Sequence, residues 1–564
     1  MASDMTSDMT NGMPSSKAGS KKGSKIGEPM KQVDVAIVGC GPAGVVLAAP
    51  LGKAGVTVHV CDRLPGVYEI PRAIALDHEI LRVFQQIGVI PAVMPHVEPF
   101  TNSEFFGVDG QLIRRMTMVQ PPFPQGYTPS VVFSQPPVER ALREHVAQLP
   151  GVTLALGLAM NSFTQDAEGV TLQYADGSHV RARYAVACDG GGSAMRAALG
   201  IELEDLDFDE PWLVVDMLVN EQGLAKLPKT SVQYCEPERP CTLVIGPKNH
   251  RRWEISLKAG EDPQEAATPE RTWALLSRWL TPADGTLWRQ SSYRFHALVA
   301  KRWRAGRVFL AGDAAHMQPP FLGQGMCQGV RDVANLAWKL TAVLRGPLTD
   351  AAAQRLLDSY GEERKAHVRE LTSRIKGVGA VICERDVAEA RARDAKLLAD
   401  CEGVVKDTPR QDVLPPLTTG LLHASPGAGT LFPQPRFLQP HLLQPDFPQP
   451  HLSQPDLPQP IFPQPPSQGG TPNDPTHAGV LMDQLHGHGW RLVSDGTLAL
   501  DAPAGTLLLI DLGATPEAEG VVAAWMQRHG AHAALVRPDH YVFGSAADAT
   551  GAQALLAAWR RTQQ

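Results

Sequence analysis

Three short motifs in this chain of 564 residues combine glycine with residues that bind ligands, and each follows an apolar run. The first motif contains Gly39, Gly41 and Gly44 and comes directly after the apolar run 33–38. In a strand, turn and helix arrangement, such glycines allow a tight turn, a close approach of a pyrophosphate, and close packing of helix on strand. The first motif therefore predicts a dinucleotide-binding turn, with the phosphates at the N-terminus of the following helix.

An acid follows the second predicted strand, where a dinucleotide fold needs one. The run 56–61 is predicted as a strand, and it leads into Asp62, 18 residues after Gly44. An acid at this place binds a ribose hydroxyl in such folds. A glycine turn without a ligand is the alternative, but the order of strand, helix, strand and acid favours dinucleotide binding. Pro50 lies in the predicted helix, where we expect a kink or an early end.

The second and third motifs each place an acid beside glycine. Asp189 and Gly190 follow the predicted strand 183–188, and Gly312 and Asp313 lie in the motif 312–316. The run 323–329 is not a second dinucleotide fingerprint, because its third glycine comes one place late. A second nucleotide is therefore not expected to have a fold of its own.

Composition excludes several classes of protein. The net charge of -7 and the lack of a basic stripe argue against nucleic-acid binding. Eight scattered cysteines form no C-x-x-C pair, so we expect reduced, packed thiols, no metal site and a cytoplasmic location. No apolar run is long enough to span a membrane, and no membrane partner is expected.

The pattern along the chain predicts an α/β protein with several parts. We expect a disordered tail over 1–30, a first part of a Rossmann-like dinucleotide-binding domain over 31–210, and a β-rich substrate domain over 211–300. The first domain returns over 301–400 with long covering helices near 330–344 and 351–401. Residues 401–474 are predicted as a linker, and 475–564 as a small thioredoxin-like α/β domain without redox cysteines. In the linker, Gln-Pro recurs seven times at a period of five residues, which favours an extended spacer over a ligand for a proline-binding domain.

The third motif and its surroundings resemble the single-component FAD-dependent aromatic hydroxylases. The resemblance rests on 306–316, Pro319-Pro320, 323–325 and 331–340. Further matches are 68–73, Gln135-Pro136, 188–191 with Arg196, and Tyr360 with Glu363-Arg364. It covers about 31–400, and it is strongest to the members that act on 3-(3-hydroxyphenyl)propionate.

The resemblance implies a set of cofactor contacts. Gly39, Gly41 and Gly44 would hold the FAD pyrophosphate, Asp62 the adenosine ribose, Asp313 the ribityl chain, and Arg72 and Gln135 would line the FAD. The loop from Gly323 to Gly325 would wrap the flavin ring, Gly312 and Pro320 would be further cofactor-binding residues, and Asp189-Gly190 would serve both FAD and the nicotinamide cofactor. Relatives carry asparagine where this chain has Cys327, which we expect to be a packed thiol.

The resemblance also implies an activity. Such an enzyme uses NADH or NADPH and O2 to hydroxylate a phenolic acid ortho to its hydroxyl, here 3-(3-hydroxyphenyl)propionate or 3-hydroxycinnamate. The alternatives are resorcinol, another phenol or an aromatic polyketide as substrate, or a flavin-fold binding protein without turnover. A homodimer is a further expectation.

The residues that would contact the substrate are weakly signalled. Tyr234 and His296 lie in the β-rich region and could accept the phenol proton, although packing is the more common role of such residues. Arginine binds carboxylates bidentately, so Arg239, Arg252 or Arg294 could hold a substrate carboxylate, with surface solvation as the alternative. We expect His316 to make a structural hydrogen bond.

Overall fold

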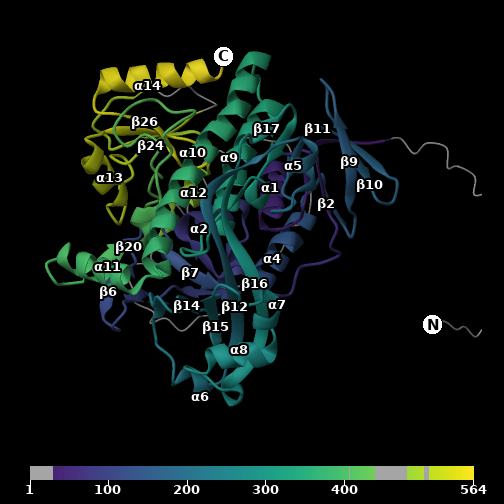
Figure 1. The fold of residues 1–564 in the computed structure, drawn as a ribbon. Helices are drawn as coiled ribbons and strands as arrows, with labels where there is room; N and C mark the ends of the chain where they lie inside the picture. Colours follow the sequence, from purple (N-terminus) through teal and green to yellow (C-terminus); the bar gives the residue numbers. More distant parts are fainter. Residues whose placement is uncertain (1–29, 406, 439–478, 501–506) are drawn as a thin grey trace, which may run out of the picture.

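The computed structural model describes residues 30–405, 407–438, 479–500 and 507–564. The predicted disordered tail, apart from its last residue Met30, and all but the first of the Gln-Pro dipeptides lie outside these residues. Figure 1 shows three parts arranged around the long helices α9 (Gly325–Arg345) and α10 (Asp350–Cys383). The three parts are a mainly parallel sheet with its helices, a large second sheet, and a C-terminal domain.

A mainly parallel sheet places the motifs at one edge. Its strand order is β17-β18-β11-β1-β2-β8, and the four strands β18, β11, β1 and β2 run parallel. Their carboxyl ends are Leu310, Ala187, Val38 and Asp62, directly before or at the three motifs and the predicted ribose acid. The strands span Lys31–Val38 (β1), Val58–Asp62 (β2), Val152–Leu156 (β8), Met160–Gln165 (β9), Val170–Tyr174 (β10), His179–Ala187 (β11), Arg304–Ala305 (β17) and Val308–Leu310 (β18).

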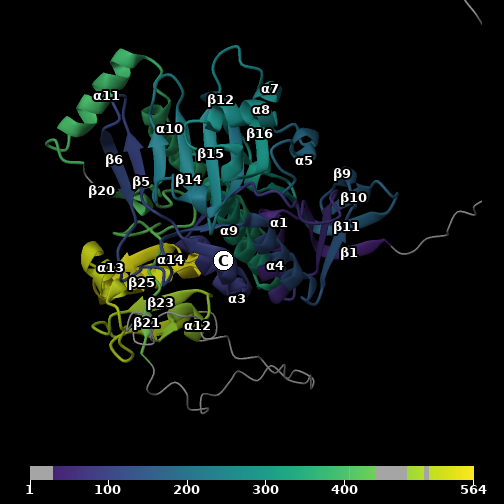
Figure 2. The same cartoon turned by 90° about the horizontal axis from the view of Figure 1, so that it is seen from below.

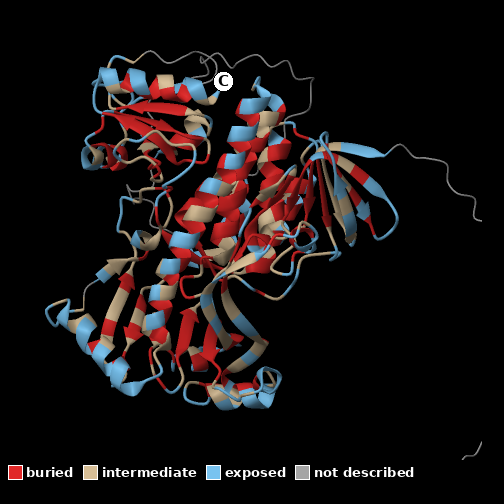
Figure 3. Cartoon of the chain, turned by 45° about the horizontal axis from the view of Figure 1, so that its top comes forward, coloured by how far each residue is buried: buried red, intermediate tan, exposed pale blue. Residues whose placement is uncertain are grey.

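Helices cover this sheet, and two of them depart from the predicted bounds. Helix α1 continues through Pro50 to Lys53, so the proline lies in the last turn and does not end the helix there. The long helix predicted over 351–401 is two helices, α10 and α11, because Asp386 caps a new helix. The helices of this part are Pro42–Lys53 (α1), His78–Ile87 (α2), Ile90–Val93 (α3), Gln135–Ala147 (α4), Ala194–Ala198 (α5), Gly325–Arg345 (α9) and Asp350–Cys383 (α10). Val387–Ala399 (α11) instead packs beside Leu112–Thr117 (β6) of the second large sheet. Figure 3 shows α9 mostly buried and α11 largely exposed.

The β-rich part is a nine-stranded sheet built from distant segments. Its order is β19-β16-β12-β15-β14-β13-β5-β6-β20, so it takes in strands from before 211 and after 300. Strand β12 begins at Leu203 and crosses the predicted border at 210 without a break. The strands span Ser103–Phe106 (β5), Leu112–Thr117 (β6), Leu203–Val219 (β12), Ser231–Tyr234 (β13), Cys241–Ile245 (β14), His250–Ser256 (β15), Gly285–Ala300 (β16), His316–Met317 (β19) and Asp407–Pro409 (β20).

One face of this sheet is covered by three short helices, Glu221–Leu224 (α6), Pro263–Ala266 (α7) and Pro269–Leu276 (α8). The other face turns toward α10 and toward the predicted dinucleotide-binding domain, which is built on the parallel sheet and is called the cofactor domain below (Figure 2). A small third sheet has three strands, Ala75–Asp77 (β3), Val97–Pro99 (β4) and Ser130–Phe133 (β7). In the sequence, these strands lie between strands of the two large sheets. Single 3-10 turns cover Met94–His96 (η1), Pro282–Asp284 (η2), Gly312–Ala314 (η3) and Arg410–Val413 (η4).

The C-terminal domain is a four-stranded sheet of order β24-β23-β25-β26 with helices on it. The apolar runs 506–511 and 533–536 predict two strands and the segment 520–529 between them a helix, which correspond to β24, β25 and α13; β23 and β26 were not predicted. The domain comprises Val480–Leu481 (β22), Met482–His486 (α12), Arg491–Ser494 (β23), Leu508–Asp511 (β24), Val521–His529 (α13), Ala533–Val536 (β25), Val542–Ala546 (β26) and Ala549–Thr562 (α14). Its thioredoxin-like character stays a prediction.

Part of the predicted linker is packed structure. Residues 407–438 contain η4 and Arg436–Phe437 (β21), and Leu417, Phe432 and Gln434 are buried. Gln434, which begins the first Gln-Pro dipeptide, donates through its side chain to the carbonyl of Gln125 at 2.9 Å. This dipeptide is therefore held against the cofactor domain, contrary to the prediction of a free spacer.

Buried ion pairs attach the C-terminal domain to the helices of the cofactor domain. Asp483 accepts two hydrogen bonds from Arg82 of α2, at 2.6 and 3.1 Å, and also contacts Arg491 of its own domain. All three side chains are almost fully buried. Burial alone would raise the pKa of Asp483, but the two arginines hold it well below its usual range.

A second buried cluster centres on Glu363 of α10. Its carboxylate accepts hydrogen bonds from Lys339 of α9 and from Arg537 of the C-terminal domain, both at 2.7 Å. Arg537 also pairs with Asp539 at 2.7 Å. Burial alone would raise the pKa of Glu363, but Arg537 and Lys339 outweigh it and lower the pKa to about 2.

We predict that Glu363→Gln reduces the free energy of unfolding by about 3–5 kcal/mol at pH 7, since it leaves Arg537 and Lys339 buried without their carboxylate. Because the folded-state pKa is lowered, the stabilisation is present above pH 4.5 and is lost as the pH falls toward 2. Urea denaturation of both proteins between pH 7 and pH 3 should therefore show a difference that decreases at the acid end.

Glu362→Gln is the matched control, because Glu362 is an exposed neighbour on the same helix. It should unfold like the unaltered protein at every pH. If Glu363→Gln were no less stable than Glu362→Gln, the buried cluster would not contribute to holding the domains together.

Candidate functional site

Backbone hydrogen bonds tie the motif loops to one another at the edge of the parallel sheet. The N–H of Gly39 donates to the carbonyl of Cys61 at 2.8 Å, and the N–H of Cys188 donates to that of Val38 at 2.8 Å. Asp62 accepts the N–H of Cys40 at 2.7 Å through one carboxylate oxygen. The glycine turn, the predicted ribose acid and the second motif are thus brought together.

The three glycines of the first motif differ in their surroundings. A Cβ on Gly39, whose φ is +103°, would lie 2.2 Å from the carbonyl oxygen of Cys188, and one on Gly44 would lie 1.9 Å from that of Gly39. A Cβ on Gly41 would meet nothing within 4 Å. Gly39 and Gly44 are therefore required by packing, whereas Gly41 borders open space.

The open space lies at the N-terminus of α1. Gly41 is the N-cap of this helix and makes no side-chain cap. The first N–H groups of a helix without a cap are free to bind an anion, and the helix dipole favours one there. These residues fit the pyrophosphate of a dinucleotide.

Two acids of the other motifs have carboxylate oxygens that accept no hydrogen bond from the described residues. Asp313, at the start of η3, is exposed and has no partner among the described residues. Asp189 accepts the N–H of Met195 at 3.2 Å through one oxygen, while its other oxygen is buried without a partner. Carboxylates of this kind fit the hydroxyl donors of a ribose or a ribityl chain.

Gln135 and Arg72 are linked. The side-chain oxygen of Gln135 accepts the N–H groups of Arg72 and Ala73, at 3.0 and 2.7 Å, and its nitrogen donates to Glu139. Arg72 itself is exposed, and its guanidinium lies 5.8 Å from the ring centre of Tyr68. Gln135 therefore positions the segment that carries Arg72, and Arg72 presents a planar cation suited to phosphate.

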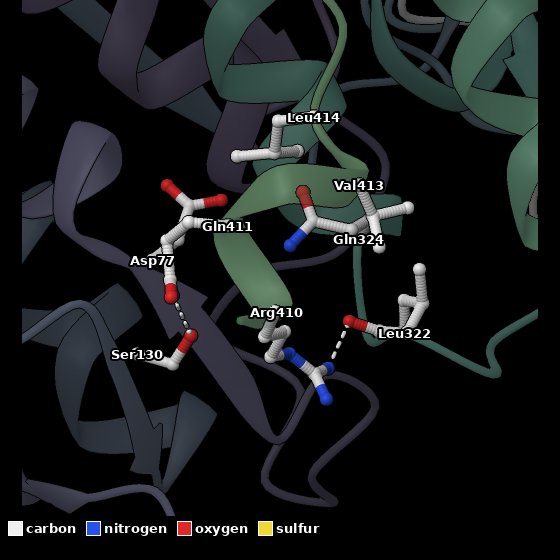
Figure 4. A pocket seen from close by; sticks show the side chains of 8 residues that line it. All are labelled: Asp77, Ser130, Leu322, Gln324, Arg410, Gln411, Val413 and Leu414. Atoms are coloured by element: carbon white, nitrogen blue, oxygen red, sulfur yellow. Dashed lines mark hydrogen bonds between the residues drawn. The ribbon is translucent and has the colours of Figure 1, made fainter. Parts of the chain in front are cut away.

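The loop that contains Pro320, Gly323 and Gly325 is supported from behind. Arg410 of η4 donates to the carbonyl of Leu322, and the thiol of Cys327 lies 3.8 Å from the carbonyl oxygen of Ala75. Figure 4 shows Arg410 and Leu322 among the residues that line a cavity between η4 and the loop, whose volume is about 10 Å³. Cys327 is fully buried, and burial raises its pKa, so it is the packed thiol that the sequence predicted.

A buried ion network lies beneath the third motif. The Nε2 of His316 lies 2.7 Å from Asp332, which also accepts the N–H of Gly312 at 3.0 Å and the Nε of Arg364 at 2.9 Å. Trp303 stacks on the His316 ring, with ring centres 5.5 Å apart. His316 thus makes the structural hydrogen bond that we expected, and the network fixes the turn that carries Asp313.

The inner face of the nine-stranded sheet meets two of these cofactor segments. Arg252 donates to the carbonyl of Arg72 at 2.7 Å, and Arg289 donates to that of Pro71. Further along the same face, the Trp212 ring contacts Phe321 with ring centres 5.7 Å apart. The strip of sheet between these contacts faces the place where cofactor and substrate would meet.

The structure does not bring the two predicted catalytic residues to this strip. The ring of Tyr234 points to the outer face, where its hydroxyl accepts the indole N–H of Trp279 at 3.1 Å. His296 is partly exposed and lies 3.4 Å from Asp209. Their role with substrate stays a prediction without support from their positions.

The inner face carries a polar group that the sequence analysis missed. Gln233, Thr242 and Glu254 face each other across β13, β14 and β15, and all three are buried. Because side chains alternate along a strand, Gln233 points inward when its neighbour Tyr234 points outward. The alternation of polar with apolar residues in 250–256 was the available signal.

The three arginines considered for a substrate carboxylate are all bound to acids of the chain. Arg239 pairs with Glu261, Arg252 with Asp216, and Arg294 with Asp209, at 2.7–2.8 Å. Their charges are therefore already compensated without a ligand.

Comparisons with known proteins identify the family. A family model described as FAD binding domain matches residues 32–375. A probable NADH-specific resorcinol 4-hydroxylase of Rhodococcus jostii is 35% identical over 93% of this chain and 94% of its own length. A 3-(3-hydroxy-phenyl)propionate/3-hydroxycinnamic acid hydroxylase of Burkholderia vietnamiensis is 37% identical over 65% of this chain and 66% of that protein.

Solved structures share the fold. The flavin-dependent monooxygenase PieE, in complex with FAD and substrate, has a TM-score of 0.73 at 21% identity and covers 95% of this chain and 99% of its own. Aklavinone-11 hydroxylase with FAD and aklavinone has a TM-score of 0.71 at 24% identity, with 95% and 100% covered. Among the described residues, no helix has the length and apolar character needed to cross a bilayer. The chain belongs to the FAD-dependent aromatic hydroxylases, as its motifs indicated, and it is a flavin monooxygenase.

Proposed function

We propose that this enzyme uses NADH and O2 to hydroxylate a small phenol of the resorcinol type. The observation that carries the proposal is the match to the Rhodococcus resorcinol 4-hydroxylase, which extends over 93% of the chain and includes the C-terminal domain. The match to the Burkholderia relative covers 65% of the chain. NADH is the expected reductant, because the Rhodococcus relative is named as specific for it.

Arg252 is not free to bind a substrate carboxylate. It is the arginine of the three that lies on the inner face of the nine-stranded sheet, and Asp216 and two backbone carbonyls occupy its guanidinium. A phenolic acid would need a cation that is free to pair with it, because a buried carboxylate without a partner is costly. Phenolic acids such as 3-(3-hydroxyphenyl)propionate are the second candidate, supported by the relatives named for them.

The cofactor residues keep the roles proposed from the sequence, with one change. The turn at Gly41 and the N-terminus of α1 would hold the pyrophosphate, Asp62 the ribose, and Asp313 the ribityl chain. Gln135 would act through the backbone of Arg72 and Ala73 instead of by direct contact. When bound, FAD supplies electron transfer from NADH and the activation of O2, and the protein supplies orientation and exclusion of water. A cytoplasmic location and a homodimer are parts of the proposal that rest on the sequence alone.

Asp62→Ala should weaken FAD binding, because a carboxylate that accepts hydroxyl hydrogen bonds would be lost. Hydrogen bonds to a charged group contribute roughly 1.5–3 kcal/mol, so we expect the dissociation constant of FAD to rise roughly 10- to 100-fold. Fluorescence titration of the apoprotein with FAD measures it. Glu144→Ala, an exposed acid of α4, is the control and should bind FAD normally; equal affinities of the two variants would remove Asp62 from the site.

Resorcinol should stimulate NADH oxidation by the FAD-loaded enzyme under air and should yield a product heavier by one oxygen atom. 3-(3-Hydroxyphenyl)propionate should give a lower kcat/KM, because a second buried carboxylate would enter the site. Oxygen-electrode rates and mass spectrometry of the products compare the two substrates. A higher kcat/KM for the phenolic acid would refute the resorcinol class and leave the second candidate.

A further inference from the structure

Glu254 is a largely buried residue whose carboxylate has no partner among the described residues and is not fully closed off from solvent. Its exposed fraction is 6%, and it makes no hydrogen bond or ion pair within the described part of the chain. Buried carboxylates are nearly always paired, because desolvation of the charge is costly. The nearby acid Asp216 shows the usual pattern, since it contacts His250, Arg252 and Arg289. An unpaired acid beside a fully paired one points to a ligand that completes it.

The register of the sheet places Glu254 between the two cofactor segments. Along β15 it lies between Arg252 and Ser256 on the inner face. Arg252 contacts the carbonyl of Arg72, whereas Ser256 is opposite Trp212, which contacts Phe321 of the flavin loop. Glu254 therefore lies in the middle of the strip that faces the cofactor domain.

The neighbours of Glu254 across the sheet are Thr242 and Val214. Thr242 donates its hydroxyl hydrogen to the side-chain oxygen of Gln233 at 2.5 Å, so its own oxygen remains able to accept. Paired residues on adjacent strands have Cβ atoms about 4.5–5.5 Å apart. Glu254 and Thr242 thus offer two acceptors on adjacent strands of one face, and a ring with two hydroxyl groups has one donor for each.

The charges around Glu254 leave it able to take up a proton. Burial raises its pKa, with Asp216 adding to the effect, and the cations of Arg252 and Arg289 only partly oppose it. Both arginines are held by Asp216 and by backbone carbonyls. A general base works best when its pKa lies near the working pH, and burial moves a carboxyl group in that direction.

We propose that Glu254 binds the phenol hydroxyl of the substrate and accepts its proton, while Thr242 accepts a hydrogen bond from a second hydroxyl. The proposal rests on the proposed function and makes it specific to a 1,3-dihydroxybenzene. The O–H bond of the phenol breaks, its proton passes to the Glu254 carboxylate, and the electron pair stays on the phenolate oxygen. The ring carbons ortho and para to that oxygen become richer in electrons and so more reactive toward oxygen.

The test compares Glu254→Gln with the unaltered holoenzyme. We expect the dissociation constant of resorcinol, measured by calorimetry on the oxidised FAD-loaded protein without NADH, to rise at least 10-fold. The rate of hydroxylation should fall roughly 100- to 10,000-fold, the range for loss of a general base. Glu254→Asp should recover part of both. FAD content and melting temperature check that each variant is folded.

Two controls make the result specific. Glu221→Gln alters an exposed acid of the same domain that makes no side-chain hydrogen bond or ion pair with the described residues, so it should change neither quantity. 1,3-Dimethoxybenzene has no hydroxyl hydrogen, so Glu254→Gln should bind it no more weakly than the unaltered enzyme does. Equal resorcinol affinities and rates for Glu254→Gln and the unaltered enzyme would overturn the proposal.

Failure of the proposed function gives a different result. If the unaltered enzyme binds and hydroxylates a phenolic acid but not resorcinol, the resorcinol class is refuted. The part assigned to Thr242 fails with it, and the same Glu254→Gln comparison with that acid then decides the role of Glu254. If the unaltered enzyme binds no phenol, the Glu254 proposal is overturned as well.

Discussion

The parallel alignment of β18, β11, β1 and β2 is the constraint on which the site depends. Each strand carries its ligand-binding residues at or just after its carboxyl end, and parallel pairing brings these ends to one edge. Residues near 40, 62, 189 and 312, far apart in the sequence, therefore meet in one place. An antiparallel strand among the four would carry its motif to the opposite edge. Hydrogen bonds such as that from Cys40 to Asp62 then fix the loops relative to each other.

Buried charge holds the surrounding parts in register. Asp332 joins His316, Arg364 and the Gly312 turn, and Glu363 and Asp483 join the C-terminal domain to α9, α10 and α2. Such clusters add little net stability compared with apolar packing. Breaking one is nevertheless costly, because it leaves a buried charge without a partner. They therefore penalise any displacement of the parts they connect. The C-terminal domain reaches the cofactor domain through Tyr541 too, whose hydroxyl donates to Glu79, a partner of Arg331.

The cofactor half of the protein could be predicted from sequence because its signals are local. A glycine turn after an apolar run, or an acid at a strand end, is set by a few adjacent residues, as Gly41 and Asp62 illustrate. The packed segment 407–438 could not be predicted, because its prolines and glycines give no periodic pattern and its order comes from contacts with distant elements. The break between α10 and α11 was missed because the charged pattern continues across it.

The substrate face shows a limit of another kind. In a strand, one position decides whether a side chain points toward the cofactor or away from it, and Tyr234 and Gln233 are adjacent residues on opposite sides. Residue chemistry favoured the tyrosine, but the register favours the glutamine and its neighbours. What distinguishes Glu254 from the other buried acids is also invisible in sequence: Asp77, Asp216, Asp332, Glu363 and Asp483 all have cationic partners. Within the described part of the chain, Glu254 is a buried acid without a cationic partner beside the cofactor segments, which is the reason for proposing that its partner is the substrate.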